Sequence, residues 1–195
     1  MNKRFQPYYD IILFAVTLLA ADALWKWSVC GDEKANVIAI WGMDLTGWFY
    51  AIEVHITDCV ERLIRLFTDT LVRKNDITLT WPSGHGARIV WSCTPVKQCF
   101  IWLCLLLTTR GGWWHKLWYI PAGWLLLYLF NILRIAIVAA VNASHPEWFH
   151  VMHVYVMKYV FYGFMFLLWV VFVELIRTRK IPHCSLRKCF GRGRG

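Results

Sequence analysis

Cys93 is followed by Thr94 and Pro95, a pair that is typical of a helix start with threonine as the N-cap and proline at the first helical position. A thiol just before such a helix lies at the positive end of the helix dipole, which favours its thiolate form. Lys97, within the first turn, adds a positive charge. These residues predict a sulfur nucleophile that attacks a carbonyl carbon.

Arg134 lies inside a long apolar run, eight residues before Asn142, or about 12 Å along a helix that rises 1.5 Å per residue. Exposing a charge to lipid there costs about 2.5–3.5 kcal/mol or more, so the side chain should face the bundle interior or a polar cavity. Asn131 is three residues earlier and shares that face. Two interpretations stay open: a cation that stabilises an oxyanion, and a structural ion pair with Asp22.

His150 and His153 are three residues apart and share a helix face. Either could move a proton, and either could be a polar helix cap. His153 lies about 4.5 Å deeper than His150 and nearer the depth of Arg134, which makes it the preferred general base. His85, in a glycine-rich turn, is a third candidate. A cysteine that attacks an amide needs both an imidazole and a cation, and these residues supply both.

The composition predicts the framework that must position these side chains. With 58% hydrophobic residues, 13 Trp and a mean hydropathy of +0.45, the 195-residue chain is too apolar for one soluble core. We expect a single domain, an all-α integral membrane bundle of about four transmembrane helices. A span needs about 20 apolar residues to cross a core of about 30 Å. Stretches that approach this length lie at about 11–29, 95–109, 121–141 and 146–176.

The distribution of basic residues predicts the topology. Seven of the 21 Lys and Arg lie at 177–195, and smaller clusters occur at residues 3–4 and 110–116. By the positive-inside rule these three regions face the cytoplasm, and segments 30–94 and 142–145 lie outside, with the catalytic residues. The formal charge of +9 is thus explained by a cytoplasmic anchor, and we expect no nucleic-acid partner.

The outer segment 30–94 should contain two further elements. Apolar residues recur at helical spacing from Leu45 to Leu71 after Asp44, a candidate N-cap, which predicts an amphipathic helix. Segments 77–81 and 87–91 flank a turn at 82–86 and predict a short β-hairpin that leads to Cys93.

The other cysteines give no zinc pattern. Cys184 and Cys189 with His183 are better explained by a solvated basic tail, and we expect no metal or organic cofactor. Cys30 and Cys59 would both lie outside, where a disulfide is one option.

Together these features resemble the exosortase/archaeosortase family of membrane-embedded cysteine transpeptidase-like enzymes. The residues that carry the resemblance are Ser92-Cys93 after a hairpin, the Asn131-Ile132-Leu133-Arg134-Ile135 run, which matches the family's Asn-x-x-Arg-Ile element, and a histidine near the start of the last span. The resemblance covers roughly residues 77–169 and is greatest to the short, Bacteroidetes-type exosortases. The family's common Cys-Ser-Gly form is replaced here by Cys-Thr-Pro.

The resemblance implies a function and a site. Cys93 would be the nucleophile, Arg134 the essential cation, and His153 or His150 the proton carrier, with Asn131 in support. The enzyme would sit in the bacterial cytoplasmic (inner) membrane, with its active site on the extracytoplasmic side. It would cleave C-terminal sorting signals of exported proteins through a thioester and pass them to a surface anchor such as a lipid or glycan amine.

Two other interpretations fit the sequence. The chain could be a non-enzymatic scaffold or transporter subunit in which Asp22, Arg134 and Lys158 form a buried charge network. It could also be a membrane cysteine hydrolase that releases substrates without anchoring them.

The basic clusters make the topology testable. Reporter fusions or cysteine labelling should place residue 190 in the cytoplasm and residue 143 outside, because the tail carries the largest cluster of basic residues and four spans return the chain to its starting side. Finding both residues on one side would rule out the four-span arrangement.

Overall fold

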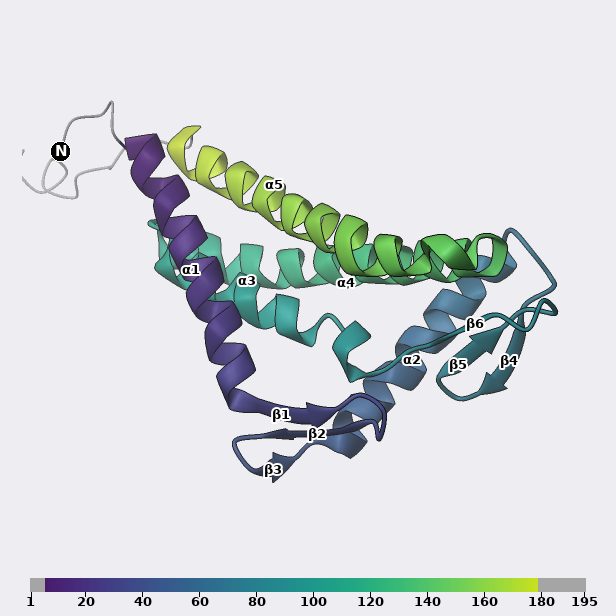
Figure 1. The fold of residues 1–195 in the computed structure, drawn as a ribbon. Helices are drawn as coiled ribbons and strands as arrows, with labels where there is room; N and C mark the ends of the chain where they lie inside the picture. The colour runs from purple at the N-terminus through teal and green to yellow at the C-terminus, as the bar shows by residue number, and fades with distance from the viewer. Residues whose placement is uncertain (1–5, 179–195) are drawn as a thin grey trace, which may run out of the picture.

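The computed structural model describes residues 6–178 of the chain, which form helices and two small sheets (Figure 1). The helices are α1 (Gln6–Ser28), α2 (Thr46–Arg65), α3 (Val96–Thr108), α4 (Trp113–Ser144) and α5 (Met157–Thr178). The strands are β1 (Val29–Asp32), β2 (Val37–Ile40), β3 (Met43–Asp44), β4 (Val72–Asn75), β5 (Thr78–Thr80) and β6 (Gly86–Arg88). The predicted basic tail at 177–195 lies almost entirely outside the described residues.

Three helical segments are long and apolar enough to cross a membrane: Tyr8–Ser28, Trp113–Ser144 and Val151–Leu175. Three of the four predicted spans thus correspond to helices that could cross a membrane by their length and composition. The apolar helix α3 has 13 residues, about 20 Å at 1.5 Å per residue, which is shorter than a hydrocarbon core of about 30 Å. A fourth crossing at 95–109 stays a prediction.

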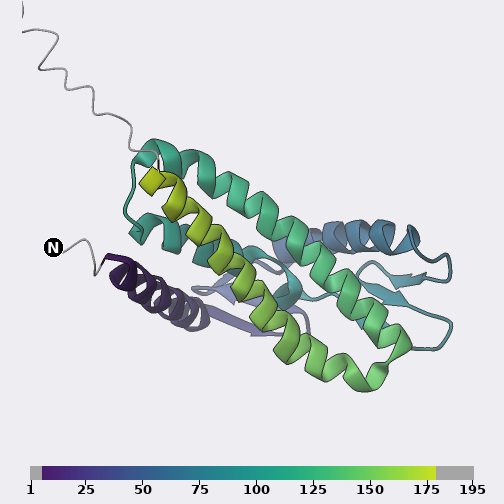
Figure 2. The same cartoon turned by 90° about the horizontal axis from the view of Figure 1, so that it is seen from above.

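The long helices α4 and α5 run antiparallel and side by side, with α1 packed against α3 (Figure 2). At one end of the bundle Arg110 stacks 5.1 Å from the ring of Tyr9, and the indole of Trp169 donates a 2.9 Å hydrogen bond to Thr109. These contacts gather the start of α1, the α3–α4 connection and α5. The two sheets and α2 extend from the other end (Figure 1). The described start of α1 and the α3–α4 connection therefore lie at the same end of the bundle.

The β structure is larger than the single hairpin expected. The predicted hairpin exists as β5 and β6, with Thr80 opposite Gly86, and β4 adds a third strand. A second antiparallel sheet, β1-β2-β3, was missed by the prediction of an otherwise helical outer segment. Its turn residue Asn36 has a φ of 54° and donates a 2.7 Å hydrogen bond to the buried Glu53 carboxylate of α2. That bond ties the first sheet to α2.

Two helix boundaries differ from the prediction. The amphipathic helix α2 ends at Arg65 rather than near Leu71, which instead packs beneath the second sheet next to Leu79 and Ile89. Asp44 accepts a 2.9 Å hydrogen bond from the backbone N–H of Thr46, close to its predicted capping role.

Helix α4 begins at Trp113 and contains Pro121, where the prediction had the helix start. Membrane helices tolerate an internal proline because neighbouring helices and local adjustments satisfy the freed backbone groups. Lys116 is consequently inside the helix and buried, and its ammonium donates a 3.1 Å hydrogen bond to the carbonyl of Leu107. It closes the C-terminal end of α3.

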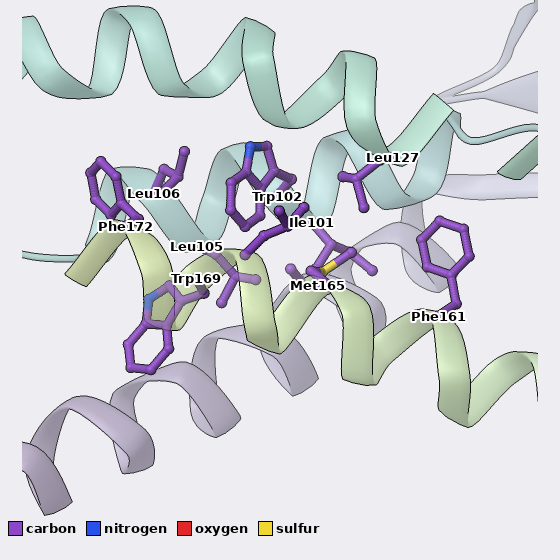
Figure 3. Packing of buried hydrophobic residues seen from close by; sticks show 11 residues of the cluster. Ile101, Trp102, Leu105, Leu106, Leu127, Phe161, Met165, Trp169 and Phe172 are labelled. Carbon is purple, nitrogen blue, oxygen red and sulfur yellow. The ribbon is translucent and has the colours of Figure 1, made fainter. Parts of the chain in front are cut away.

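One apolar cluster joins α1, α3, α4 and α5, and Figure 3 shows Trp102 of α3 among its side chains. Trp102 is fully buried. A Cβ atom at Gly123 of α4 would lie 2.1 Å from the Trp102 indole nitrogen, so only glycine allows this approach. A small residue at a helix contact is how membrane helices pack closely.

Replacing this glycine should destabilise the bundle. Gly123→Ala forces the Trp102 ring or α4 to move, and overpacking of this kind costs about 1–3 kcal/mol. Thermal unfolding in detergent should show a lower midpoint for this variant. Gly163→Ala is the matched control, because a Cβ there meets nothing within 4 Å. Equal midpoints for the two variants would contradict the packing account.

Candidate active site

Cys93 closes a short 3-10 turn, Trp91–Cys93, that connects β6 to α3. The Thr94 hydroxyl donates a 2.7 Å hydrogen bond back to the Trp91 carbonyl, and α3 begins at Val96 with Pro95 as its N-cap. The prediction of Thr94 as a side-chain N-cap was wrong, because the hydroxyl stabilises the preceding turn instead. Cys93 is thereby held in that turn, ahead of the first turn of α3.

Two asparagines of α4 hold this segment against the helix. The Asn131 side-chain amide donates a 2.9 Å hydrogen bond to the Cys93 carbonyl, and the Asn142 amide donates a 2.7 Å bond to the Gly86 carbonyl. The two asparagines are eleven residues apart, three turns of helix, so they share a face. Asn131 is fully buried, and it fixes the backbone of Cys93 at a defined height on α4.

The spacing of the two asparagines also explains the 3-10 turn. Eleven residues of α-helix span about 16 Å, whereas the seven-residue step from Gly86 to Cys93 reaches about 23 Å when fully extended. The chain must therefore coil between the two anchors, and it does so at Trp91–Cys93.

Arg134 lies on α4 between these anchors and is half-buried. Its guanidinium carbon is 5.7 Å from the ring centroid of Phe161 on α5. Among residues 6–178 no ion pair involves Arg134; the Asp22 carboxylate pairs instead with Lys26 at 2.8 Å and Lys97 at 2.5 Å. The ion pair between Asp22 and Arg134, one of the two interpretations left open by the sequence, is therefore not formed.

His153 lies in a six-residue π-helix, Val151–Val156, that precedes α5. Single-turn π segments are rare in proteins, and those that occur are often found at functional sites. The imidazole stacks on Phe149 with ring centroids 5.5 Å apart and an interplanar angle of 8°. His150 contacts Tyr155 edge-on, and the third candidate, His85, is an exposed residue of the β5–β6 turn.

Two cavities meet at Arg134 and His153. The narrow cavity, about 90 Å³, contains Cys93, Arg134 and His153 together with side chains that are mostly apolar. The wide cavity, about 440 Å³, is also lined by Arg134 and His153. Cys93 does not line it, but the two residues on either side of the cysteine, Ser92 and Thr94, do. The structure thus brings together the nucleophile, cation and base candidates from three distant parts of the sequence. His150 is absent from the lining of both cavities.

The wide cavity is basic. It carries Lys26, Lys97 and Lys158 in addition to Arg134, while Glu33 of the β1–β2 turn is the acidic residue on its wall. Lys158 also lines this cavity, and among residues 6–178 no ion pair joins it to Asp22.

Burial raises the pKa of the Cys93 thiol above its usual value, while the positive charge of Arg134 and a hydrogen bond from Ser92 act against this shift. The expectation that the helix start favours the resting thiolate was therefore wrong. A thiol with a raised pKa is protonated at neutral pH, so attack on a carbonyl requires a base. His153, on the wall of the same cavity, is the group placed for this role.

The remaining cysteines form no disulfide in the described part of the chain. Cys30 is exposed on β1, and Cys59 lies 3.4 Å from the Tyr128 hydroxyl and 3.9 Å from the imidazole of His55. The Cys30 to Cys59 option is therefore not adopted. The His55, Cys59 and Tyr128 contact was missed, although the i,i+4 spacing of the first two residues is visible in the sequence.

No group of three His, Cys, Asp or Glu side chains within the described residues could hold a metal ion. The weak Cys184, Cys189 and His183 pattern lies outside those residues.

No family model, curated protein or solved structure matches the chain.

The Asn131 contact makes a specific prediction. Asn131→Ala and Asn142→Ala each remove one donor to a backbone carbonyl, and each should cost about 1–3 kcal/mol of stability. Asn131→Ala alone should also change the rate at which iodoacetamide alkylates Cys93, by about tenfold, because Asn131, unlike Asn142, hydrogen-bonds to the cysteine backbone. Mass spectrometry of the Cys93 peptide measures this rate. Equal alkylation rates in the two variants would show that Asn131 does not position the thiol.

Proposed function

We propose that this chain is a membrane-embedded cysteine transpeptidase or protease that cleaves C-terminal sorting signals of exported proteins through a thioester. The observation that carries the proposal is the single cavity shared by Cys93, Arg134 and His153, in which the arginine has no ion-pair partner among residues 6–178. Cations inside membrane segments are costly and are commonly functional. A cation left unpaired beside a half-buried cysteine supports a role in stabilising negative charge during a reaction.

The first half-reaction uses all three residues. His153 takes the proton of the Cys93 thiol, and the sulfur attacks the carbonyl carbon of the scissile amide. The C–S bond forms as negative charge moves to the carbonyl oxygen, where Arg134 stabilises it. The protonated His153 then gives its proton to the leaving amine, the C–N bond breaks, and a thioester remains on Cys93.

The second half-reaction regenerates the thiol. An acceptor amine attacks the thioester carbonyl, the new C–N bond forms and the C–S bond breaks. The amine loses one proton to His153, which returns it to the Cys93 thiolate. A lipid or glycan amine serves as acceptor in the anchoring version of the reaction, and water serves in the hydrolytic version.

The arrangement of the bundle supports the substrate class. The wide cavity lies near the end of the bundle that carries the sheets, where Trp25 and Trp91 line it. Aromatic residues of this kind are enriched at membrane interfaces. A substrate with a motif, one apolar helix and a basic cluster would place its scissile bond at this depth when its helix lies beside α4 and α5. With α3 as a short fourth crossing, this interface faces outward from the bacterial cytoplasmic membrane.

The proposal agrees with the sequence resemblance to exosortases and archaeosortases, which is based on Cys93, on the run from Asn131 to Ile135, and on a histidine before the last helix. In the structure Asn131 contacts the Cys93 backbone and Ile135 lines the narrow cavity. The same run thus supplies the anchor, the cation and part of the cavity wall.

Removing the nucleophile or changing the cation should abolish processing. Cys93→Ala should leave an exported protein with such a C-terminus uncleaved, as followed by a mobility shift in cells. Arg134→Lys should not restore activity, because an ammonium lacks the planar fork of donors that a guanidinium offers. Cys30→Ser is the matched control. Cleavage by Cys93→Ala would refute the thioester mechanism, and near wild-type cleavage by Arg134→Lys would make the arginine a structural charge.

Replacing each of the two histidines should have a different effect on the cleavage rate in the same assay. Positioned proton transfer contributes about 10²–10⁴-fold to rate, so His153→Ala should nearly abolish cleavage and His150→Ala should cost much less. The rates are compared at equal membrane abundance of the variants. Full loss with His150→Ala and retained activity with His153→Ala would reverse the assignment.

A further inference from the structure

We propose that the narrow cavity is the specificity subsite for the residue on the acyl side of the scissile bond, and that it accepts side chains up to about the size of valine. The inference deepens the proposed function and rests on Cys93 being its nucleophile. It assigns a size and a chemistry to a substrate position.

The location of the sulfur determines which cavity takes the acyl group. Cys93 lines the narrow cavity, whereas Arg134 and His153 line both. A carbonyl carbon bonded to the sulfur must therefore lie at the narrow cavity, with its oxygen toward Arg134. The next carbon of the substrate, Cα, then directs its side chain into the narrow cavity. The wide cavity, which is also lined by His153, is left for the departing and incoming amines.

The chemistry of the walls selects an apolar side chain. Beyond the three reacting groups, most of the lining is aliphatic or aromatic, and α4 contributes Ile135, Val138 and Ala139. Arg88, the other charged residue of the lining, is exposed and donates a hydrogen bond to the Lys34 carbonyl. A polar side chain placed against these walls would lose its hydrogen bonds with water without replacing them.

The size of the cavity limits the side chain. An apolar cavity of about 150 Å³ accommodates benzene, which has six heavy atoms. By the same proportion, the 90 Å³ here holds three or four heavy atoms. Alanine and valine side chains, with one and three heavy atoms, fit this volume. The seven heavy atoms of a phenylalanine side chain exceed it.

Aminoacyl chloromethyl ketones test the subsite without a natural substrate. The Cys93 sulfur displaces chloride from such a probe, so the C–S bond forms as the C–Cl bond breaks, and the amino-acid side chain is placed in the acyl-side subsite. The full chain in detergent is treated with N-acetyl-alanyl, valyl and phenylalanyl chloromethyl ketones. Alkylation of the Cys93 peptide is followed by mass spectrometry, and each rate is divided by the iodoacetamide rate, which reports thiol reactivity alone.

The wild-type protein should react at least about tenfold faster with the alanyl and valyl probes than with the phenylalanyl probe, since pocket discrimination per methylene is roughly 10- to 200-fold. Ala139→Val fills the cavity and should slow the valyl probe while sparing the alanyl one. Val138→Ala enlarges it and should raise the phenylalanyl rate. Ala136→Val is the matched control, because Ala136 lines a separate groove with Leu63 and Phe67.

The outcomes distinguish this inference from the proposed function. If Cys93 reacts with all three probes at similar normalised rates, or if Ala136→Val changes selectivity as much as Ala139→Val, the subsite is refuted and the nucleophile stands. If the probes react with Cys93 no faster than with the exposed Cys30, the nucleophile itself is refuted. Thermal unfolding of each variant shows whether a lost rate reflects a lost fold.

Discussion

The hydrogen bond from Asn131 to the Cys93 carbonyl is the contact on which the rest of the site depends. The cysteine belongs to a short turn between a hairpin and a helix, and such a turn has no fixed height against a membrane bundle unless a buried group holds it. Asn131 supplies that anchor from the middle of α4, and Asn142 fixes the hairpin three turns away. Because Arg134 lies between them on the same helix, positioning the turn also positions the thiol relative to the cation.

A second constraint is the cost of placing a guanidinium inside an apolar bundle. The structure meets it partly through the Phe161 ring and partly through the cavities that Arg134 borders. Asp22 does not neutralise the charge, because Lys26 and Lys97 already bind that carboxylate. The cation therefore remains available to an oxygen that becomes negative during reaction. Burial also raises the pKa of the Cys93 thiol, so the thiol rests protonated and depends on a base.

The sequence was sufficient to predict the apolar helices and the grouping of Cys93, Arg134 and His153. A charged residue within an apolar run, and a polar residue at the end of such a run, can both be recognised from the sequence alone. It did not predict the first sheet, since its strands are only two to four residues long. The start of α4 was misplaced because a proline was taken as a boundary in a helix that tolerates it. The Asn142 anchor was also missed, although its eleven-residue spacing from Asn131 predicts a shared face. The partner of Asp22 depends on how α1 and α3 pack, which no local pattern specifies.

The central claim is that Cys93 carries the acyl group of a cleaved substrate. The most direct measurement is an acid quench of the wild-type protein during processing of an exported protein with a motif, an apolar helix and a basic C-terminus, followed by mass spectrometry of the Cys93 peptide. The account predicts a substrate fragment attached to Cys93 as a hydroxylamine-sensitive thioester, which should accumulate when acceptor amines are withheld. Cleaved product with Cys93 unmodified throughout the time course would contradict it.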